Sequence, residues 1–210
     1  MKTVPYSIPV ITFLTWGPQG SNHEYATRRY IDALGLGAAA RIDLVDDIGQ
    51  GAADVIAGRA DHLVLCAVHP QAASTVALYR QGLYLVDSFI SKSRDLAVVR
   101  RRAAAQPCAL ALMEPTRGYV DTGRWAQTIS VASVSAVADG LRDGRFDAGI
   151  SWADLAQQDP AHFIVDEFIG SVDDAWLVFG RQRLSDGAVL VWPDSPAARL
   201  MRGQAVDPGR

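Results

Sequence analysis

Short apolar runs alternate with longer stretches rich in alanine and leucine along most of the 210 residues. The apolar runs predict buried strands, because they are short, rich in β-branched residues and bounded by turn-forming residues. We expect strands over residues 11–15, 41–45, 63–67, 83–90, 95–99, 109–113, 129–132, 148–151, 163–169 and 175–179. The stretches between them predict helices over residues 24–34, 47–57, 72–79, 116–125, 135–143 and 152–157. This alternation is typical of an α/β protein with mainly parallel sheets covered by helices.

Two polar segments divide this pattern into two lobes. Residues 91–94 precede the strand expected at 95–99, and residues 159–162 precede the last two expected strands. We therefore expect an outer lobe formed by residues 1–92 and 161–200, an inserted lobe over residues 93–160, and a flexible tail over residues 201–210. Ligands of open α/β sheets bind where strands lead into helices, so two such lobes predict a cleft between them.

The composition argues against several classes of function. A net charge of −3 leaves no excess of Lys and Arg for binding nucleic acid. The apolar run at residues 10–14 is too short for a signal peptide or a membrane span, so we expect a cytoplasmic protein without membrane contact. Cys66 and Cys108 lie in apolar stretches without CxxC spacing and are expected to be buried thiols.

Common catalytic and nucleotide-binding motifs are absent from the sequence. It contains no Walker loop, GxSxG elbow or HExxH pair, and no GxGxxG with a suitably spaced acidic residue. We therefore expect a small-molecule ligand and neither a metal nor a cofactor. A homodimer is compatible with the sequence.

The strongest local signal is the turn at residues 17–22, which joins the first expected strand to the first helix. Its glycines, including Gly20, allow close approach of the backbone to a ligand, and the free N–H groups of a helix start favour an anion. Ser21 and Asn22 add side-chain donors. The alternative is that these two residues only cap the helix and that the turn holds no ligand.

Similar donor-rich segments follow two later strands. Thr116 and Arg117 follow the strand at 109–113, and Ser133 and Ser135 follow the strand at 129–132. A guanidinium can hold a carboxylate through two hydrogen bonds, so Arg117 is the cation that we expect near a substrate carboxylate. The alternatives are plain helix caps for the three hydroxyl residues and a solvated surface position for Arg117.

Two of the four histidines are expected at the cleft. His23 lies in the first helical turn, and His69 follows a buried strand. A histidine can deliver a proton at neutral pH, so we expect His69 to be the proton donor and His23 the second candidate. The alternative for His23 is that it only shields the helix start. His62 and His162 are expected at the surface.

The run Gly17-Pro18-Gln19-Gly20-Ser21-Asn22-His23-Glu24-Tyr25-Ala26 resembles the Gly-Pro-x-Gly-Thr/Ser-x-x-Glu-x-Ala opening of prephenate dehydratase catalytic domains. Further stretches follow in that family's order, at 69–70, 133–138, 144–150 and 174–178, so that the likeness spans about residues 10–180. The resemblance implies a two-lobe fold like that of type 2 periplasmic binding proteins. It also implies a substrate like prephenate, a cyclohexadiene with a ring carboxylate, a pyruvyl side chain and a hydroxyl.

One motif departs from the dehydratase pattern. Dehydratases carry Thr-Arg-Phe where this chain has Asp174-Ala175-Trp176, and they use the Thr to help the hydroxyl leave and the Arg to hold a carboxylate. The bacilysin-type prephenate decarboxylases also lack Thr-Arg-Phe, have a Trp at the last position, and have a His in the place of His69. The sequence is therefore most similar to this branch, although His23 and Asp174 differ from it.

The function that the resemblance implies is non-aromatising decarboxylation of prephenate, in which CO2 is lost and the ring hydroxyl is retained. The product, a dihydro-4-hydroxyphenylpyruvate, would serve antibiotic or unusual amino-acid biosynthesis. We expect the first turn and the segments at 116–117 and 133–135 to hold the carboxylates, and Trp176 to form a wall against the ring. The alternatives are prephenate dehydratase, another lyase or isomerase acting on a related cyclic acid, and a non-catalytic protein that binds a small acid.

Overall fold

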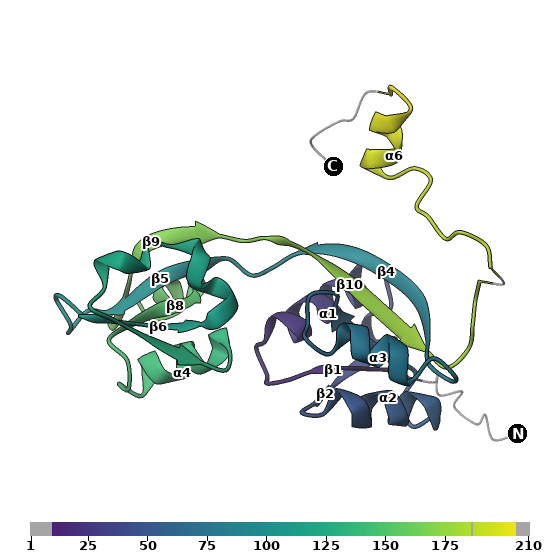
Figure 1. Cartoon of the computed structure of the whole chain (residues 1–210), viewed down its shortest axis with the longest axis horizontal. Helices are drawn as coiled ribbons and strands as arrows, with labels where there is room; N and C mark the ends of the chain where they lie inside the picture. Colours follow the sequence, from purple (N-terminus) through teal and green to yellow (C-terminus); the bar gives the residue numbers. More distant parts are fainter. Residues whose placement is uncertain (1–9, 186, 205–210) are drawn as a thin grey trace, which may run out of the picture.

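The computed structural model describes residues 10–185 and 187–204, which form two five-stranded sheets with helices packed on them (Figure 1). The first sheet has the order β2-β1-β3-β10-β4 and the second has the order β7-β6-β8-β5-β9. The strands of the first sheet are β1 (Ile11–Trp16), β2 (Ala40–Val45), β3 (His62–Cys66), β4 (Tyr84–Lys92) and β10 (Asp173–Gly180). Those of the second are β5 (Leu96–Arg101), β6 (Ala109–Met113), β7 (Gln127–Val131), β8 (Ala148–Trp152) and β9 (Phe163–Gly170). The two-lobe α/β fold expected from the sequence is confirmed.

Both sheets are mixed rather than mainly parallel. In the first sheet β1 pairs with β2 and β3 in parallel, whereas β10 pairs antiparallel with β3 and β4. In the second sheet β6 pairs with β7 and β8 in parallel, whereas β5 pairs antiparallel with β8 and β9. The antiparallel strands are the ones next to the two crossings between lobes, because the chain leaves each sheet along one strand and returns along its neighbour.

The second crossing lies later in the chain than the sequence indicated. Strand β9 pairs with β5 in the second sheet, so the inserted lobe continues to Gly170 instead of ending at residue 160. The polar segment 159–162 is the loop between α5 (Asp154–Gln158) and β9 within that lobe. The two crossings are joined by a hydrogen bond of 2.9 Å from the Ser93 N–H to the Val172 carbonyl.

Helices cover the sheets close to the expected positions, with one exception. The first lobe carries α1 (Asn22–Ala33), a short 3-10 turn (Gly37–Ala39), α2 (Ile48–Ile56) and α3 (Ala72–Leu78), and the second carries α4 (Val134–Arg142) and α5 (Asp154–Gln158). The helix expected at 116–125 is instead two 3-10 segments, Glu114–Tyr119 and Thr122–Arg124. Val120 is extended between them, and the Asp121 carboxylate accepts from the Gly123 N–H and begins a new turn.

After β10, Arg181 and Arg183 still contact the outer lobe, and the chain then leaves it. The chain leaves β10 and carries α6 (Pro196–Met201) away from the first sheet (Figure 1), and most of its side chains are exposed. Helix α6 was not predicted, although Ser195 caps it and Pro196 occupies its first turn, a common helix-start pattern. The tail expected at 201–210 includes the end of α6, and its residues 205–210 lie outside the described residues.

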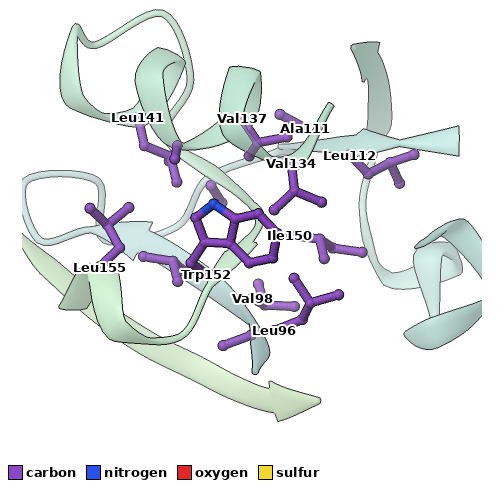
Figure 2. Close-up of a cluster of buried hydrophobic side chains, with 14 of the residues drawn as sticks. Leu96, Val98, Ala111, Leu112, Val134, Val137, Leu141, Ile150, Trp152 and Leu155 are labelled. Carbon is purple, nitrogen blue, oxygen red and sulfur yellow. The ribbon is translucent and has the colours of Figure 1, made fainter. Parts of the chain in front are cut away.

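Each lobe has its own apolar core. The second lobe is built around Trp152, which Figure 2 shows among side chains from the strands and from α4. The first sheet has apolar clusters on both faces, one under α2 and α3 and one under α1. Cys66 is buried in one of these, as expected, whereas Cys108 is exposed at the start of β6 and that expectation was wrong.

Gly149 on β8 allows α4 to pack closely on the second sheet. A Cβ at this position would overlap Val137 Cγ1 of α4 and would lie 2.9 Å from the Ala111 carbonyl oxygen. We expect Gly149→Ala to lower the free energy of unfolding by about 1–3 kcal/mol, because both neighbours are fixed in the core.

Gly118→Ala is the matched control: no atom lies within 4 Å of its added Cβ. Its unfolding free energy in urea should stay within about 0.5 kcal/mol of wild type. Equal stability of the two variants would contradict this packing account.

Candidate active site

A cavity of about 890 Å³ lies between the lobes and is lined by residues of both. Its volume is in the range of small-molecule sites, on the order of 300–1,000 Å³. The lining comes from the turn before α1, the segment after β3, both crossings, the start of the 3-10 segment after β6, the start of α4 and the end of β8. Much of this wall is aromatic, with Trp16, Trp152 and Trp176 among its residues.

The turn before α1 uses several of its own donors to form a helix cap. The Ser21 hydroxyl accepts from the Glu24 N–H at 3.3 Å and donates to the Trp16 carbonyl, while the Glu24 carboxylate accepts from the Gly20 N–H at 2.7 Å. This is a variant of the capping box, because the Glu24 carboxylate binds the N–H of Gly20 instead of that of the cap residue Ser21. Gly20 has φ +76° and is not among the residues that line the cavity, so its expected contact with substrate is not found.

Two backbone N–H groups of this turn stay available to a ligand. Those of Asn22 and His23 have no acceptor among the described residues, and both residues line the cavity. They lie at the N-terminus of a 12-residue helix, where partial positive charge favours an anion. The Asn22 side chain is engaged with Ser93 and Asp174, so the backbone here is better placed than this side chain to bind a carboxylate.

The start of α4 presents a second set of donors from the opposite lobe. The Ser133 hydroxyl accepts from the Ala136 N–H at 3.0 Å and thus caps the helix. The N–H groups of Val134 and Ser135 and the Ser135 hydroxyl have no partner among the described residues, and both side chains line the cavity. Ser135 is therefore a direct anion-binding candidate, whereas Ser133 acts as the cap.

Thr116 and Arg117 differ in their positions. Thr116 lines the cavity, but its hydroxyl donates to the Met113 carbonyl at 2.7 Å. Arg117 is not part of the lining: it is ion-paired with Glu114 at 2.6 Å and also donates to Thr128. Arg117 follows Glu114 by one turn of the 3-10 segment, which brings the two side chains together. The expected contact of Arg117 with substrate is therefore not found.

His23 is buried and neutral. Its Nε2 accepts from the Cys66 N–H at 3.3 Å, which fixes the unprotonated nitrogen. Burial, with a smaller contribution from the charge of His69, lowers the pKa of His23 to about 3. A group with this pKa carries almost no proton to donate at neutral pH, so His23 is a poor general acid.

The buried His23 makes the stability of the fold depend on pH. Its pKa is about 3 in the folded protein and about 6.5 in the unfolded chain, so between these values the unfolded chain binds the extra proton. Stability is therefore lost as pH falls below about 6.5, by up to about 1.4 kcal/mol per pH unit.

His23→Gln keeps an acceptor for the Cys66 N–H but does not titrate. Between about pH 6.5 and pH 5, we expect the unfolding free energy of this variant to fall by about 2 kcal/mol less than that of wild type. Parallel pH profiles in urea unfolding would contradict this assignment.

His69 is more accessible and keeps the role of candidate proton donor. Its Nδ1 accepts from the Gln71 N–H at 3.2 Å, so the neutral ring carries its proton on Nε2. Its ring packs against Trp16 and His23, with centroids 4.9 and 5.5 Å apart. Partial burial lowers the pKa of His69. A bound dicarboxylate would raise this pKa again, because a nearby negative charge favours imidazolium.

Trp176 forms part of the inner wall of the cavity. It is fully buried, and its ring packs edge-on against His23 and parallel to Phe89. Its indole N–H has no partner among the described residues. Because its side chain is 0% exposed, Trp176 lies behind the cavity wall, and its contact with a substrate ring stays a prediction.

Arg94 is a site residue that the sequence analysis missed. It follows β4 in the first crossing, donates to the Gly20 carbonyl at 2.7 Å and to the Asp154 carboxylate at 2.7 Å, and lies over the Trp152 ring. It therefore joins the turn of one lobe to the α5 start of the other at the edge of the cavity. The basic residue within a polar crossing was visible in the sequence, but its partners lie 60 or more positions away.

Solved structures with this fold include prephenate dehydratases. The enzyme from Arthrobacter aurescens, in complex with L-Phe, is 19% identical and superposes with a TM-score of 0.63 over 85% of this chain and 63% of that chain. The prephenate dehydratase of Staphylococcus aureus subsp. aureus Mu50 is 13% identical, with a TM-score of 0.58 over 84% of this chain and 68% of that one. This chain has a prephenate dehydratase-like fold. It spans somewhat less than two thirds of the length of the Arthrobacter enzyme.

The same fold also occurs in proteins with other described activities. GqqA, described as a novel type of quorum quenching acylase, is 12% identical, with a TM-score of 0.53 over 83% of this chain and 65% of that chain. No family model and no curated protein matches the sequence. At these identities the likeness establishes the fold alone, and the activity has to be argued from the site.

Two features are absent from the described residues. None of their helices is long and apolar enough to cross a membrane. Within the same residues, no group of three or more His, Cys, Asp or Glu side chains is arranged to hold a metal ion.

Proposed function

We propose that this protein catalyses the non-aromatising decarboxylation of prephenate or of a closely related cyclic dicarboxylate. The observation that carries the proposal is the pair of helix starts that face one cavity from opposite lobes. The N–H groups of Asn22 and His23 on one side, and those of Val134 and Ser135 on the other, lack protein acceptors among the described residues. Two separate anion sites suit a substrate with two carboxylates.

The proposed reaction breaks the bond between the ring and its carboxylate. The electron pair of that bond moves into the double bonds of the ring, CO2 leaves, and a ring carbon takes up one proton. The hydroxyl stays on the ring, so the product is a dihydro-4-hydroxyphenylpyruvate. Because loss of both CO2 and hydroxide would give an aromatic and much more stable product, the site has to direct the reaction as well as accelerate it.

The side chains of the cavity support this division of roles. His69 as imidazolium is the proposed donor of the ring proton, since His23 is neutral and already accepts a hydrogen bond. Trp16 provides apolar surface for the ring, with the buried Trp176 packed behind the wall, and a poorly solvated carboxylate loses CO2 more readily. Such a product would enter unusual amino-acid or antibiotic biosynthesis.

The test is incubation of the purified protein with prephenate, with separation of the products by mass. The proposal predicts faster loss of prephenate than in protein-free buffer, release of CO2, and a product that retains the hydroxyl. Phenylpyruvate as the main product would favour the prephenate dehydratase alternative, which the shared fold keeps open. Tight binding without turnover would favour a non-catalytic binding protein.

A further inference from the structure

Asp174 is held at the cavity wall by groups from two other segments. Ser93 of the first crossing and Asn22 of the turn before α1 both donate to the same carboxylate oxygen, Oδ2, the second at 3.3 Å. Asn22 also donates to the Ser93 hydroxyl at 2.9 Å. The carboxylate is thus oriented by hydrogen bonds from residues more than 80 positions away in the sequence.

The second oxygen of this carboxylate is free to accept. Within residues 10–185 and 187–204, Oδ1 of Asp174 receives no hydrogen bond and no basic side chain lies within ion-pair distance. Arg94, the arginine of the described cavity lining, is engaged with Asp154 and the Gly20 carbonyl. A carboxylate offers about four acceptor positions, so this one can accept further donors from a ligand.

The negative charge of Asp174 restricts which groups of a ligand can lie against its carboxylate. A substrate carboxylate would be repelled there, whereas the helix starts of α1 and α4 offer donors to anions. A cyclic dicarboxylate of the class proposed above carries one other polar group that can donate, its ring hydroxyl. This step rests on the proposed function.

We propose that Asp174 accepts a hydrogen bond from the ring hydroxyl of the substrate, and that the protein selects cyclic 2-oxo acids that carry such a hydroxyl. The contact also affects the outcome of the reaction. A leaving hydroxyl needs a proton donated to its oxygen, and an acceptor at its hydrogen supplies none. The bond between ring carbon and oxygen is therefore retained while CO2 departs.

The selectivity can be measured by binding, without turnover. 4-Hydroxyphenylpyruvate and phenylpyruvate are stable ring 2-oxo acids that differ only in the hydroxyl. Titration calorimetry of wild type should give a Kd about 10-fold or more lower for the hydroxylated acid, as expected for a hydrogen bond to a charged group. For Asp174→Ala, the Kd values of the two acids should differ by no more than about 2-fold.

The matched control removes a charge from the neighbouring residue. Asp173 precedes Asp174 on β10 and is exposed, so Asp173→Asn should keep the wild-type preference. Melting temperatures of all variants check that they are folded. Equal affinity of wild type for the two acids, a preference that survives Asp174→Ala, or failure of both acids to bind would overturn the inference.

Turnover provides a second readout that separates the two proposals. Asp174→Asn introduces an amide donor beside the hydroxyl, so the share of phenylpyruvate among the products of prephenate should rise at least several-fold over wild type. An unchanged product ratio in an active Asp174→Asn would overturn the role in retaining the hydroxyl. If wild type prefers the hydroxylated acid but does not decarboxylate prephenate, the proposed function fails and the hydroxyl-binding role of Asp174 stands.

Discussion

Replacing His69 with glutamine is expected to lower the kcat for prephenate decarboxylation by about 100-fold or more, with KM changed only a few-fold. Glutamine can still hydrogen-bond at the cavity wall but cannot carry a transferable proton. His69 is the partly accessible histidine of the cavity, whereas His23 is buried, neutral and hydrogen-bonded through Nε2 to the Cys66 N–H. For this reason we propose His69 as the source of the proton in the product.

The pH dependence of kcat tests the same assignment. In the proposed reaction the active form of His69 is the imidazolium. The kcat of wild type should therefore fall as pH rises above the pKa of His69 in the complex, and His69→Gln should lack this limb. His162→Gln is the control: His162 is exposed, is paired with Asp159 and is not part of the cavity lining, so the kcat of this variant should equal that of wild type. Near wild-type kcat in His69→Gln would contradict the assignment.

Truncation of Trp176 to alanine is expected to lower the free energy of unfolding by about 3–5 kcal/mol. Trp176 is 0% exposed and packs against His23 and Phe89, so its removal leaves a large void between β10 and α1. This loss is a large fraction of the stability of a typical domain, about 5–15 kcal/mol. Trp176→Phe should recover much of it, because the phenyl ring refills part of the space and removes an indole N–H that has no partner among the described residues.

Trp192 provides the matched control for this experiment. It is 69% exposed in the segment after β10, so Trp192→Ala should change the unfolding free energy by no more than about 0.5 kcal/mol. Urea unfolding of the three variants and wild type, followed by circular dichroism, gives the comparison. Similar losses for Trp176→Ala and Trp192→Ala would show that Trp176 is not part of the packed core.

Elements with strong local patterns were predictable from the sequence. The ten strands were placed within a few residues, because each is a short apolar run between turn-forming residues. The turn before α1 was recognised from its glycines and from Ser21 and Asn22, and Ser21 does cap the helix. His69, Ser135 and Trp176 were also placed at the cavity, because each follows or lies within a strand that ends there.

The errors concern interactions between segments far apart in the chain. Arg117 was expected in the cleft from its position after a strand, but the 3-10 turn pairs it with Glu114. Arg94 and Ser93 were missed because their partners, Asp154 and Asp174, come from other elements. The end of the inserted lobe was misplaced because a polar loop precedes β9, and strand pairing, not loop composition, determines which sheet a strand joins.

The most direct test of the proposed decarboxylation is the reaction of prephenate with the purified protein in deuterium oxide, followed by nuclear magnetic resonance of the product. The proposed reaction predicts release of CO2 and a non-aromatic ring that retains its hydroxyl-bearing carbon and gains deuterium at a saturated carbon. Uptake of deuterium into the ring should be absent or much slower with His69→Gln. An aromatic product without ring deuterium, or consumption of prephenate no faster than in protein-free buffer, would contradict the account.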